Sequence, residues 1–463
     1  MFSKLTINGL RGFSGEKHLN LSIANGSAGS GLTVLVGPNN SGKSTIIEAF
    51  KALNSVKITY NKPSFTEGKR NKQANDRVEI KLFKEDLEFV TLKTAIQGGS
   101  EIEVIENGLS VRDINLFVIK SRRTFEPYFS KNSWNRNEFL KNDIFDNQRS
   151  SSYNNFSSRL FNINKDPDKF NQVLSKVLNP LPNWTIDQSD SGNYYIKFNY
   201  DNHYHSSEGA GEGLLSIFTI VDALYDSEQD DIIVIDEPEL SLHPSLQKKL
   251  CQLLLEFSSD RQIIISTHSP YFVSWESLLN GGTLARVIKK DKGTEINQLE
   301  ETQIKSIKAL LGNLFNPHTL GIEAKEIFFL EDNIIIVEGQ EDVVYLQRIL
   351  KILGQHFNGS FFGWGIGGAG NLDKILGILY KLGYDKVSVI LDKNMEDVVK
   401  KYKKNYSTYL FKVIPTNDIR DKDALKKKPA VEGLIDQGGK NIKEQYKKEI
   451  ESIIEEVNEY NKM

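Results

Sequence analysis

Short apolar runs organise the first half of the chain. Three of them, at residues 32–36, 232–235 and 263–265, have the length and the β-branched content of buried strands. Apolar residues with helical spacing lie between and after these runs, at about 44–56, at 214–225 and up to Phe257. This alternation of strands and helices predicts an α/β fold.

The segment between the first two runs has a different pattern. Apolar and polar residues alternate over 78–83 and again over 102–105, which predicts a β-meander attached to the first lobe. Residues 124–182 are rich in Asn, Ser, Phe and Tyr, and helical spacing returns only near 170–178. We expect a mostly helical insertion with long loops there.

The last third repeats the strand and helix alternation on a smaller scale. Strands are predicted at 334–337 and 386–391, and helices up to Leu353 and over 372–382. This pattern predicts a small parallel sheet with its chemistry at the carboxyl ends of the strands. Residues 443–463 read as an amphipathic helix whose apolar side, Ile450, Ile453, Ile454 and Val457, is better explained by packing than by membrane binding.

Length and composition bound the class of protein. At 463 residues the chain should form two or three domains. No apolar run reaches about 18 residues, and the N-terminus reads as a strand rather than a signal peptide, so we expect a cytoplasmic protein without a membrane partner. The single cysteine, Cys251, is expected to be a buried thiol. A net charge of −3 neither supports nor excludes DNA binding.

The chemistry of the first half begins directly after the strand at 32–36. The next residues fit the phosphate-binding pattern G-x-x-x-x-G-K-[ST], in which backbone N–H groups and a helix N-terminus hold phosphate oxygens. Lys43 would reach the β- and γ-phosphates of ATP and Ser44 would hold Mg²⁺. The segment is Gly37, Pro38, Asn39, Asn40, Ser41, Gly42, Lys43 and Ser44.

Three later segments extend this site. The run at 232–235 ends in Asp236 and Glu237, which in a phosphate-loop ATPase would organise the Mg²⁺ shell and polarise the attacking water. The strand at 262–266 leads to His268, at the edge of the same site. A glycine-rich stretch precedes the helix at 214–225 and contains Ser207, Gly209, Gly211 and Glu212.

The ordered set GPNNSGKS, SSEGAGEG, IIVIDEPELSLHP and STHSP closely resembles the ABC-type ATPase heads of DNA-repair and chromosome-maintenance proteins. The resemblance implies that Asp236 and Glu237 are the acidic pair, that His268 is the switch histidine, and that residues 207–213 touch the γ-phosphate bound by a second head. ATP would then lie between two copies of the chain. A Mg²⁺-sensing glutamine is also expected, with Gln73 and Gln97 as candidates.

Acidic residues mark the strand ends of the last third. Glu338 follows the strand at 334–337 and Asp392 follows the strand at 386–391, so both should meet at one edge of the sheet. Converging carboxylates form sites for Mg²⁺ or Mn²⁺, which stabilise the oxygens of phosphodiester cleavage. The glycine-rich stretch 363–370 allows an alternative, a second nucleotide site, but no acidic ribose partner follows it.

VEGQED and LDKN resemble the metal-binding pattern of TOPRIM domains, with Asn394 in place of the second Asp of D-x-D. The resemblance implies metal ligands at Glu338, Asp342, Asp392 and Asn394, with Glu396 or Asp397 compensating for the missing charge. Glu432 is a further acidic candidate, and Lys440 or Lys443 a basic one. The lysine runs at 400–404 and 426–428 are either solvated helix faces or contacts to a phosphate backbone.

An ABC-type head over 1–325 followed by a TOPRIM domain over 326–463 resembles the OLD (overcoming lysogenization defect) family, which includes the Gabija ATPase-nuclease. This resemblance implies a Mg²⁺-dependent DNA endonuclease or nickase of phage defence, regulated by ATP and assembled as a homodimer or larger. The alternative is an ATP-gated sensor or assembly subunit with a degenerate TOPRIM domain, which scaffolds or restrains a separate defence protein.

Overall fold

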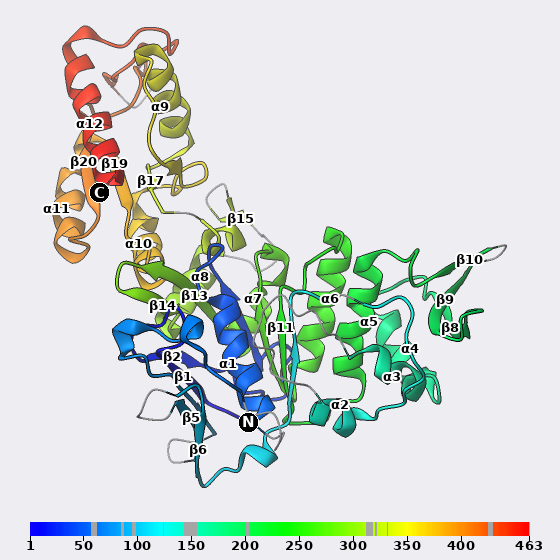
Figure 1. Ribbon diagram of the computed structural model, residues 1–463. Coiled ribbons are helices and arrows are strands. Elements are labelled where there is room, and N and C mark those ends of the chain that lie inside the picture. Colours follow the sequence, from blue (N-terminus) through cyan, green and yellow to red (C-terminus); the bar gives the residue numbers. More distant parts are fainter. Residues whose placement is uncertain are drawn as a thin grey trace. The chain divides into compact units, whose positions relative to one another are not determined.

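The protein is described by a computed structural model over residues 1–56, 63–84, 88–94, 99–123, 125–142, 155–200, 203–311, 318–319, 322–330, 332–424 and 429–462. Backbone contacts divide the chain into two units, Met1–Gln298 and Leu299–Met463 (Figure 1). The sequence placed this boundary at residue 325. It lies earlier because α8 (Glu301–Leu311) packs against α10 (Leu372–Lys381) of the second unit.

A six-stranded sheet forms the centre of the first unit. Its order is β14-β13-β3-β12-β11-β7, and all neighbours are parallel except β13 and β14. Strands β3, β11 and β12 are buried along their whole length, so continuous apolar runs mark them in the sequence. The bounds are β3 Leu32–Val36, β7 Leu116–Ile119, β11 Ile232–Asp236, β12 Gln262–Ser266, β13 Thr283–Lys290 and β14 Gly293–Gln298.

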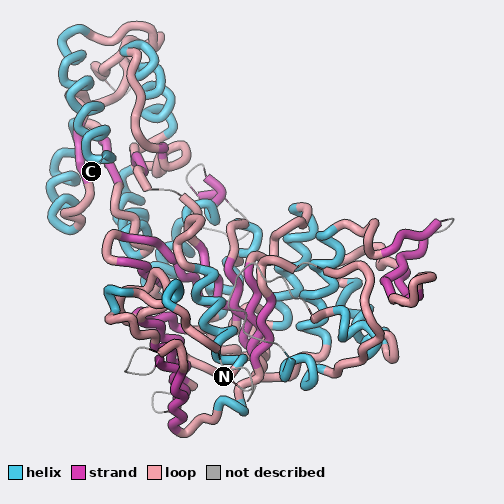
Figure 2. Tube along the Cα trace, viewed as in Figure 1, coloured by secondary structure: helices cyan, strands magenta, loops and turns pink. Residues whose placement is uncertain are grey.

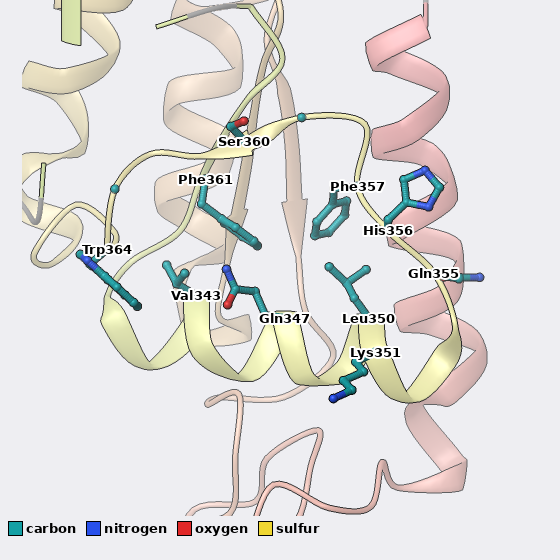
Figure 3. A pocket seen from close by; sticks show the side chains of 12 residues that line it. Val343, Gln347, Leu350, Lys351, Gln355, His356, Phe357, Ser360, Phe361 and Trp364 are labelled. Carbon is teal, nitrogen blue, oxygen red and sulfur yellow. The ribbon is translucent and has the colours of Figure 1, made fainter. Parts of the chain in front are cut away.

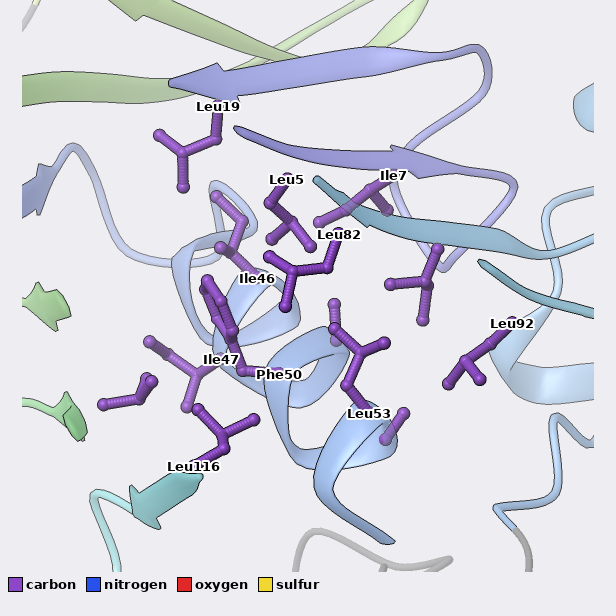
Figure 4. Packing of buried hydrophobic residues seen from close by; sticks show 14 of the residues in the cluster. Leu5, Ile7, Leu19, Ile46, Ile47, Phe50, Leu53, Leu82, Leu92 and Leu116 are labelled. Atoms are coloured by element: carbon purple, nitrogen blue, oxygen red, sulfur yellow. The ribbon is translucent and has the colours of Figure 1, made fainter. Parts of the chain in front are cut away.

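The core of this unit surrounds α1 (Lys43–Ser55), which lies between two sheets. Phe50 and Leu53 of α1 pack against Leu5 and Leu82 of the second sheet (Figure 4). That sheet is antiparallel, with the order β2-β1-β4-β5-β6, and contains the predicted meander. Its bounds are β1 Lys4–Asn8, β2 Lys17–Asn20, β4 Glu79–Phe83, β5 Phe89–Thr94 and β6 Ile102–Asn107.

The opposite face of the central sheet carries α5 and α6, as Figure 1 shows. Their bounds, with that of the short α7, are α5 Glu212–Tyr225, α6 Pro244–Phe257 and α7 Trp275–Asn280. Cys251 of α6 is buried, as the sequence predicted.

The described residues of the predicted insertion, 124–182, form three short helices, and a small antiparallel sheet follows them from residue 183. The helices fulfil the sequence prediction in part, whereas the sheet, of order β10-β9-β8, was not predicted. Arg159 anchors the insertion on α5, because its fully buried guanidinium donates to Asp222 at 2.9 Å. The bounds are α2 Arg136–Asn142, α3 Ser157–Ile163, α4 Pro167–Ser175, β8 Asn183–Gln188, β9 Tyr194–Tyr200 and β10 His203–Ser206.

The second unit contains the predicted small parallel sheet, with the order β18-β17-β19-β20. Helices α9 and α12 pack together in one apolar cluster with residues of β17 and β19, and helices and strands alternate along the chain in this unit (Figure 2). The predicted apolar side of α12 is buried there. The bounds are β17 Ile334–Ile336, α9 Gln340–Leu353, β18 Ser360–Phe361, β19 Val387–Leu391, α11 Glu396–Asn405, β20 Leu410–Val413 and α12 Glu444–Lys462.

Two further strands, β15 (His318–Thr319) and β16 (Ile322–Glu323), form a separate antiparallel pair in this unit. Among the residues described, no helix is both long and apolar enough to cross a membrane.

Candidate functional site

The loop at Gly37–Ser44 joins β3 to α1 with the backbone that phosphate binding requires. Gly37 has a φ of 142° and Gly42, the N-cap of α1, a φ of 115°. A Cβ on Gly37 would lie 2.0 Å from the Val287 carbonyl oxygen, so only glycine fits there. The N-terminus of a 13-residue helix therefore opens onto a concave, glycine-lined turn.

Within this loop, Lys43 folds back over the turn. Its Nζ donates to the carbonyl oxygens of Gly37, at 2.9 Å, and Pro38, at 3.0 Å. Burial lowers the pKa of Lys43, and the nearby charges of Glu237, Asp236 and Glu239 partly offset this effect. The hydroxyl of Ser41 is buried without a hydrogen-bond partner among the described residues. Phosphate oxygens would supply acceptors for both side chains.

The carboxyl end of β11 delivers the acidic pair to the same place. Asp236 accepts hydrogen bonds from the hydroxyls of Ser266 and, at 3.5 Å, Ser44. Glu237 has a φ of 50°, and burial, then the charges of Asp236 and Glu239, raises the pKa of its carboxyl. The structure thus brings the predicted Mg²⁺ ligands, Ser44 and Asp236, into contact.

His268 closes the other side of this site. Its Nε2 lies 3.8 Å from Oε1 of Glu237. Burial lowers the pKa of His268, so its ring is neutral at pH 7 and offers one donor and one acceptor. A raised pKa on the carboxylate beside a neutral imidazole is an arrangement suited to handling a proton.

Glu239 fixes the two strand ends relative to each other. One carboxylate oxygen accepts from the Thr267 hydroxyl at 2.9 Å and the other from the backbone N–H of His268 at 2.5 Å. These bonds join the residues after β11 to those after β12. The sequence named Glu239 as part of the acidic motif without a role, and this contact supplies one.

Arg123 was missed by the sequence analysis. Its guanidinium donates to the carbonyl oxygens of Asp236 at 2.8 Å and Glu237 at 2.7 Å, and to the hydroxyl of Ser216 on α5 at 2.8 Å. Burial lowers the pKa of Arg123 to about 10, still well above pH 7. One charged side chain therefore holds both the acidic strand end and α5. Nothing in the local sequence around Arg123 marks it.

The glycine-rich segment before α5 is exposed only in part. Gly209, Gly211 and Glu212 are exposed at the start of the helix, where a second copy could reach them. Ser207 is different, because it is buried and its hydroxyl donates to the Pro127 carbonyl at 2.7 Å. The predicted contact of Ser207 with nucleotide is therefore not available in this conformation.

Of the two candidate glutamines, only Gln73 belongs to the part of the chain that the structure describes. Gln73 is exposed in a short turn, where its backbone N–H donates to the side chain of Asn71, whereas Gln97 lies outside the described residues. The Mg²⁺-sensing role stays unassigned.

The second unit brings acidic side chains together at the carboxyl edge of its sheet, where the strand order reverses between β17 and β19. Glu338 follows β17 and Asp392 follows β19, as predicted. Asp418, after β20, joins them and was missed because no motif marks it. We call Glu338, Asp342, Asp392 and Asp418 the carboxylate cluster.

The charges of these carboxylates act on one another's pKa values. Burial, then the charges of Asp342, Asp418 and Glu338, raises the pKa of Asp392 to about 8. Burial also raises the pKa of Asp342 to about 6, although its Oδ2 accepts from the Gly339 N–H at 2.8 Å. A cation would relieve this repulsion.

The cations near the cluster are already paired. Lys422 contacts Asp418 at 2.5 Å and Glu341 at 2.8 Å, and Arg420 contacts Glu341 at 2.5 Å. Lys422, which the sequence analysis did not name, therefore pairs with a member of the carboxylate cluster. Lys443 instead pairs with Asp421 and with Glu432, the extra acidic candidate.

The fit of the cluster to a divalent metal rests on its donors. Carboxylate oxygens from three strand ends are the ligands that Mg²⁺ and Mn²⁺ prefer. Across the described residues, however, no three His, Cys, Asp or Glu side chains are already placed to hold an ion. Asn394 is exposed in the turn after Asp392, and Glu396 and Asp397 are exposed in the first turn of α11. The ligand set therefore remains a prediction.

The lysines of α11 at 400, 401, 403 and 404 are all exposed, which fits either role predicted for them. The second run, 426–428, lies outside the described residues.

Comparison with known protein families shows which family the first unit matches. A family model described as "AAA domain, putative AbiEii toxin, Type IV TA system" matches residues 32–274, more than half of the chain. The match covers the phosphate loop, the acidic pair and His268.

Curated relatives match shorter segments. The chain is 28% identical over 171 residues to the endonuclease GajA of Bacillus cereus, covering 35% of this chain and 30% of that protein. It is 30% identical over 131 residues to the Old nuclease of Escherichia phage P2 (28% and 22% covered) and 31% identical over 134 residues to the OLD nuclease of Thermus scotoductus (27% and 24%). These relatives confirm the predicted OLD resemblance, although the matches span less than a third of each relative's length.

Among solved structures, an SmcHead bound to the C-terminal winged-helix domain of ScpA aligns with a TM-score of 0.43 and 16% identity, covering 66% of this chain and 99% of that one. The SMC head domain from Thermotoga maritima aligns with a TM-score of 0.39 and 19% identity, covering 65% and 99%.

Proposed function

Because the chain belongs to the AAA domain family that matches residues 32–274, we propose that it binds and hydrolyses ATP in the first unit and cleaves DNA in the second. The relatives named as nucleases support the second activity. We further propose that the protein acts in the cytoplasm, in phage defence, and that ATP regulates its cleavage.

Each residue of the first site has a separate role in ATP binding and hydrolysis. The N–H groups of the Gly37–Ser44 loop and the Nζ of Lys43 hold the phosphates, while Ser44 and Asp236 hold Mg²⁺. Glu237 orients the attacking water, and His268 lies where it can bond the γ-phosphate. The exposed start of α5 in a second copy would cover the nucleotide, so we propose that the protein works as a homodimer or larger assembly.

For DNA, the carboxylate cluster is the observation that carries the proposal. At a single sheet edge, burial and the charges of Glu338 and Asp418 raise the pKa values of Asp342 and Asp392, which is typical of a functional site. Glu338, Asp392 and Asp342 would hold Mg²⁺ or Mn²⁺, with Asp418 as a further donor. A bound divalent ion would stabilise the attacking and leaving oxygens of a phosphodiester. Lys422 is placed to bind a nearby phosphate oxygen.

The second candidate is a sensor or assembly subunit that acts on a separate defence protein. The exposed Asn394 favours it, since this position lacks the charge of the second Asp in D-x-D. ATP binding would be retained in this case and cleavage would be absent.

A plasmid cleavage assay separates the nuclease from the sensor subunit. Purified protein is incubated with supercoiled plasmid and Mg²⁺ or Mn²⁺, with and without ATP. Cleavage that is lost in Asp392→Ala, while ATP hydrolysis continues, supports the nuclease. The matched control is Asp373→Ala, which changes an exposed aspartate of α10 outside the predicted ligand set. Cleavage that survives in Asp392→Ala contradicts the site, and no cleavage under any condition favours the sensor. Lys43→Ala should abolish nucleotide binding in either case.

A further inference from the structure

A groove of about 580 Å³ runs along α9 in the second unit, between that helix and the loop Gln355–Trp364. We call it the α9 groove. Figure 3 shows Val343, Gln347 and Leu350 of α9 facing Phe357 and Phe361 of the loop, with Trp364 at one end and His356 at the other. No function described above uses this groove.

One end of the groove adjoins the carboxylate cluster. Gly365, next to Trp364, packs so closely on Gly339 that an added Cβ would lie 2.6 Å from its backbone. Gly339 in turn follows Glu338 directly, and the Gly368 N–H donates to the Glu338 carbonyl at 3.1 Å. Trp364 is therefore held beside the strand end that carries Glu338.

The lining has the chemistry of a nucleotide site. Trp364 is 50% exposed although it is a large aromatic side chain, so its ring is open for stacking. Lys351 forms no ion pair within the described residues, and none of the twelve lining residues is acidic. In a chain of net charge −3, this groove favours an anionic ligand with a flat ring. The exposed amide of Gln347 offers a donor and an acceptor to a base edge.

The walls are also fixed before any ligand binds. Asn458 of α12 donates to the His356 carbonyl at 2.8 Å and accepts from the Asn358 N–H at 2.7 Å. Asn461 donates to the Asn358 carbonyl at 2.8 Å. The loop is thus fastened to a 19-residue helix, and a preformed groove binds with less loss of conformational freedom.

We propose that the α9 groove takes an unpaired base of the DNA strand whose phosphate lies at the carboxylate cluster, with Trp364 stacking on the base and Lys351 contacting the backbone. This inference rests on the proposed nuclease function and adds a positioning site to it. It also gives the protein a preference for DNA that is single-stranded or locally opened next to the cut.

Binding of a thymidine oligonucleotide of about eight residues to the full chain tests this, in an Asp392→Ala background that prevents cutting. Trp364 is more exposed than Trp184 and Trp275, so a stacked base should quench the fluorescence of Trp364. This quenching should be absent from Trp364→Phe. Trp364→Ala should weaken binding roughly 5- to 150-fold, whereas Trp364→Phe should stay within about threefold. Lys351→Ala should lower the slope of log affinity against log salt by about 0.7.

The controls lie on neighbouring surfaces. Ile352→Ala removes a 47% exposed side chain of α9 that does not line the groove, and Lys448→Ala removes an exposed lysine of α12; neither should alter binding. Thymidine monophosphate should bind far more weakly than the oligonucleotide. Equal binding of the monophosphate would assign the groove to a free nucleotide and overturn the proposal.

The outcome is separable from that of the proposed function. If plasmid is cut with Mg²⁺ but Trp364→Ala changes neither oligonucleotide affinity nor the KM of cleavage, the groove proposal is wrong and the nuclease stands. If no condition gives cleavage but Trp364→Ala still weakens binding, the groove stands as a DNA site and the nuclease proposal fails.

Discussion

Replacing Asp392 by Asn should stabilise the metal-free protein, and more strongly at pH 7 than at pH 5. Burial, then the charges of Asp342, Asp418 and Glu338, raises the pKa of Asp392 from 3.8 to about 8. In the unfolded chain this carboxyl loses its proton near pH 4, whereas in the folded protein it keeps the proton to about pH 8. Between these values the folded state binds one more proton, so the free energy of unfolding falls as the pH rises.

The size of the effect follows from the same window. One proton contributes about 1.4 kcal/mol per pH unit, so the wild type should lose roughly 2.7 kcal/mol relative to Asp392→Asn between pH 5 and pH 7. Asp342, with a pKa of about 6, titrates in the same range, and Asp392 is only partly buried, so solvent screening reduces the effect. About half of this difference, roughly 1.3 kcal/mol, is therefore the smallest value that the reasoning allows.

Hydrogen exchange in peptides that cover β17 and β19, measured in EDTA at both pH values, reports the stability of this unit separately from the first. Asp397→Asn is the control, since the Asp397 side chain is 98% exposed and pairs only with Lys400 among the described residues. Added Mg²⁺ should protect the wild type more than Asp392→Asn. An equal gain at pH 5 and pH 7, or a loss of protection at pH 7, would refute the electrostatic account.

Three further substitutions probe other contacts. Arg123→Ala should lower the rate of ATP hydrolysis at least tenfold, on the order of 1.4 kcal/mol, because the strand end that carries Asp236 and Glu237 loses its support. Nucleotide affinity should change little, and Arg122→Ala, which changes an exposed neighbour, is the control. An equal loss of nucleotide binding would contradict this role. Gly365→Ala should lower the melting temperature of the second unit, since φ is 89° and the new Cβ would meet the Gly339 backbone. Gly370→Ala, which has open space around the new Cβ, should leave the melting temperature unchanged, and equal melting temperatures of the two variants would refute the steric argument. Arg159→Ala should lower the free energy of unfolding by about 3–5 kcal/mol, because it leaves Asp222 buried and unpaired. Urea unfolding measures this free energy, and a decrease of less than about 1 kcal/mol, typical of a surface substitution, would contradict the prediction.

The sequence by itself determined the buried strands and the phosphate loop of this protein. Continuous apolar runs identified β3, β11 and β12, because strands of a parallel sheet are buried on both faces and need no alternation. The phosphate loop was equally readable, since its glycines are required by backbone geometry that no other residue adopts easily. The acidic residues at strand ends could be placed at one sheet edge for the same reason, as topology fixes where parallel strands end.

Only the tertiary structure decided which other side chains join these sites. Arg123 and Asp418 come from loops without a recognisable pattern, and their roles arise from distances between segments far apart in the chain. The burial of Ser207 and the earlier boundary after Gln298 also depend on packing that a local pattern does not encode. The α9 groove is the clearest case, because it exists only where a helix, an edge strand and a loop fastened by α12 enclose the same space.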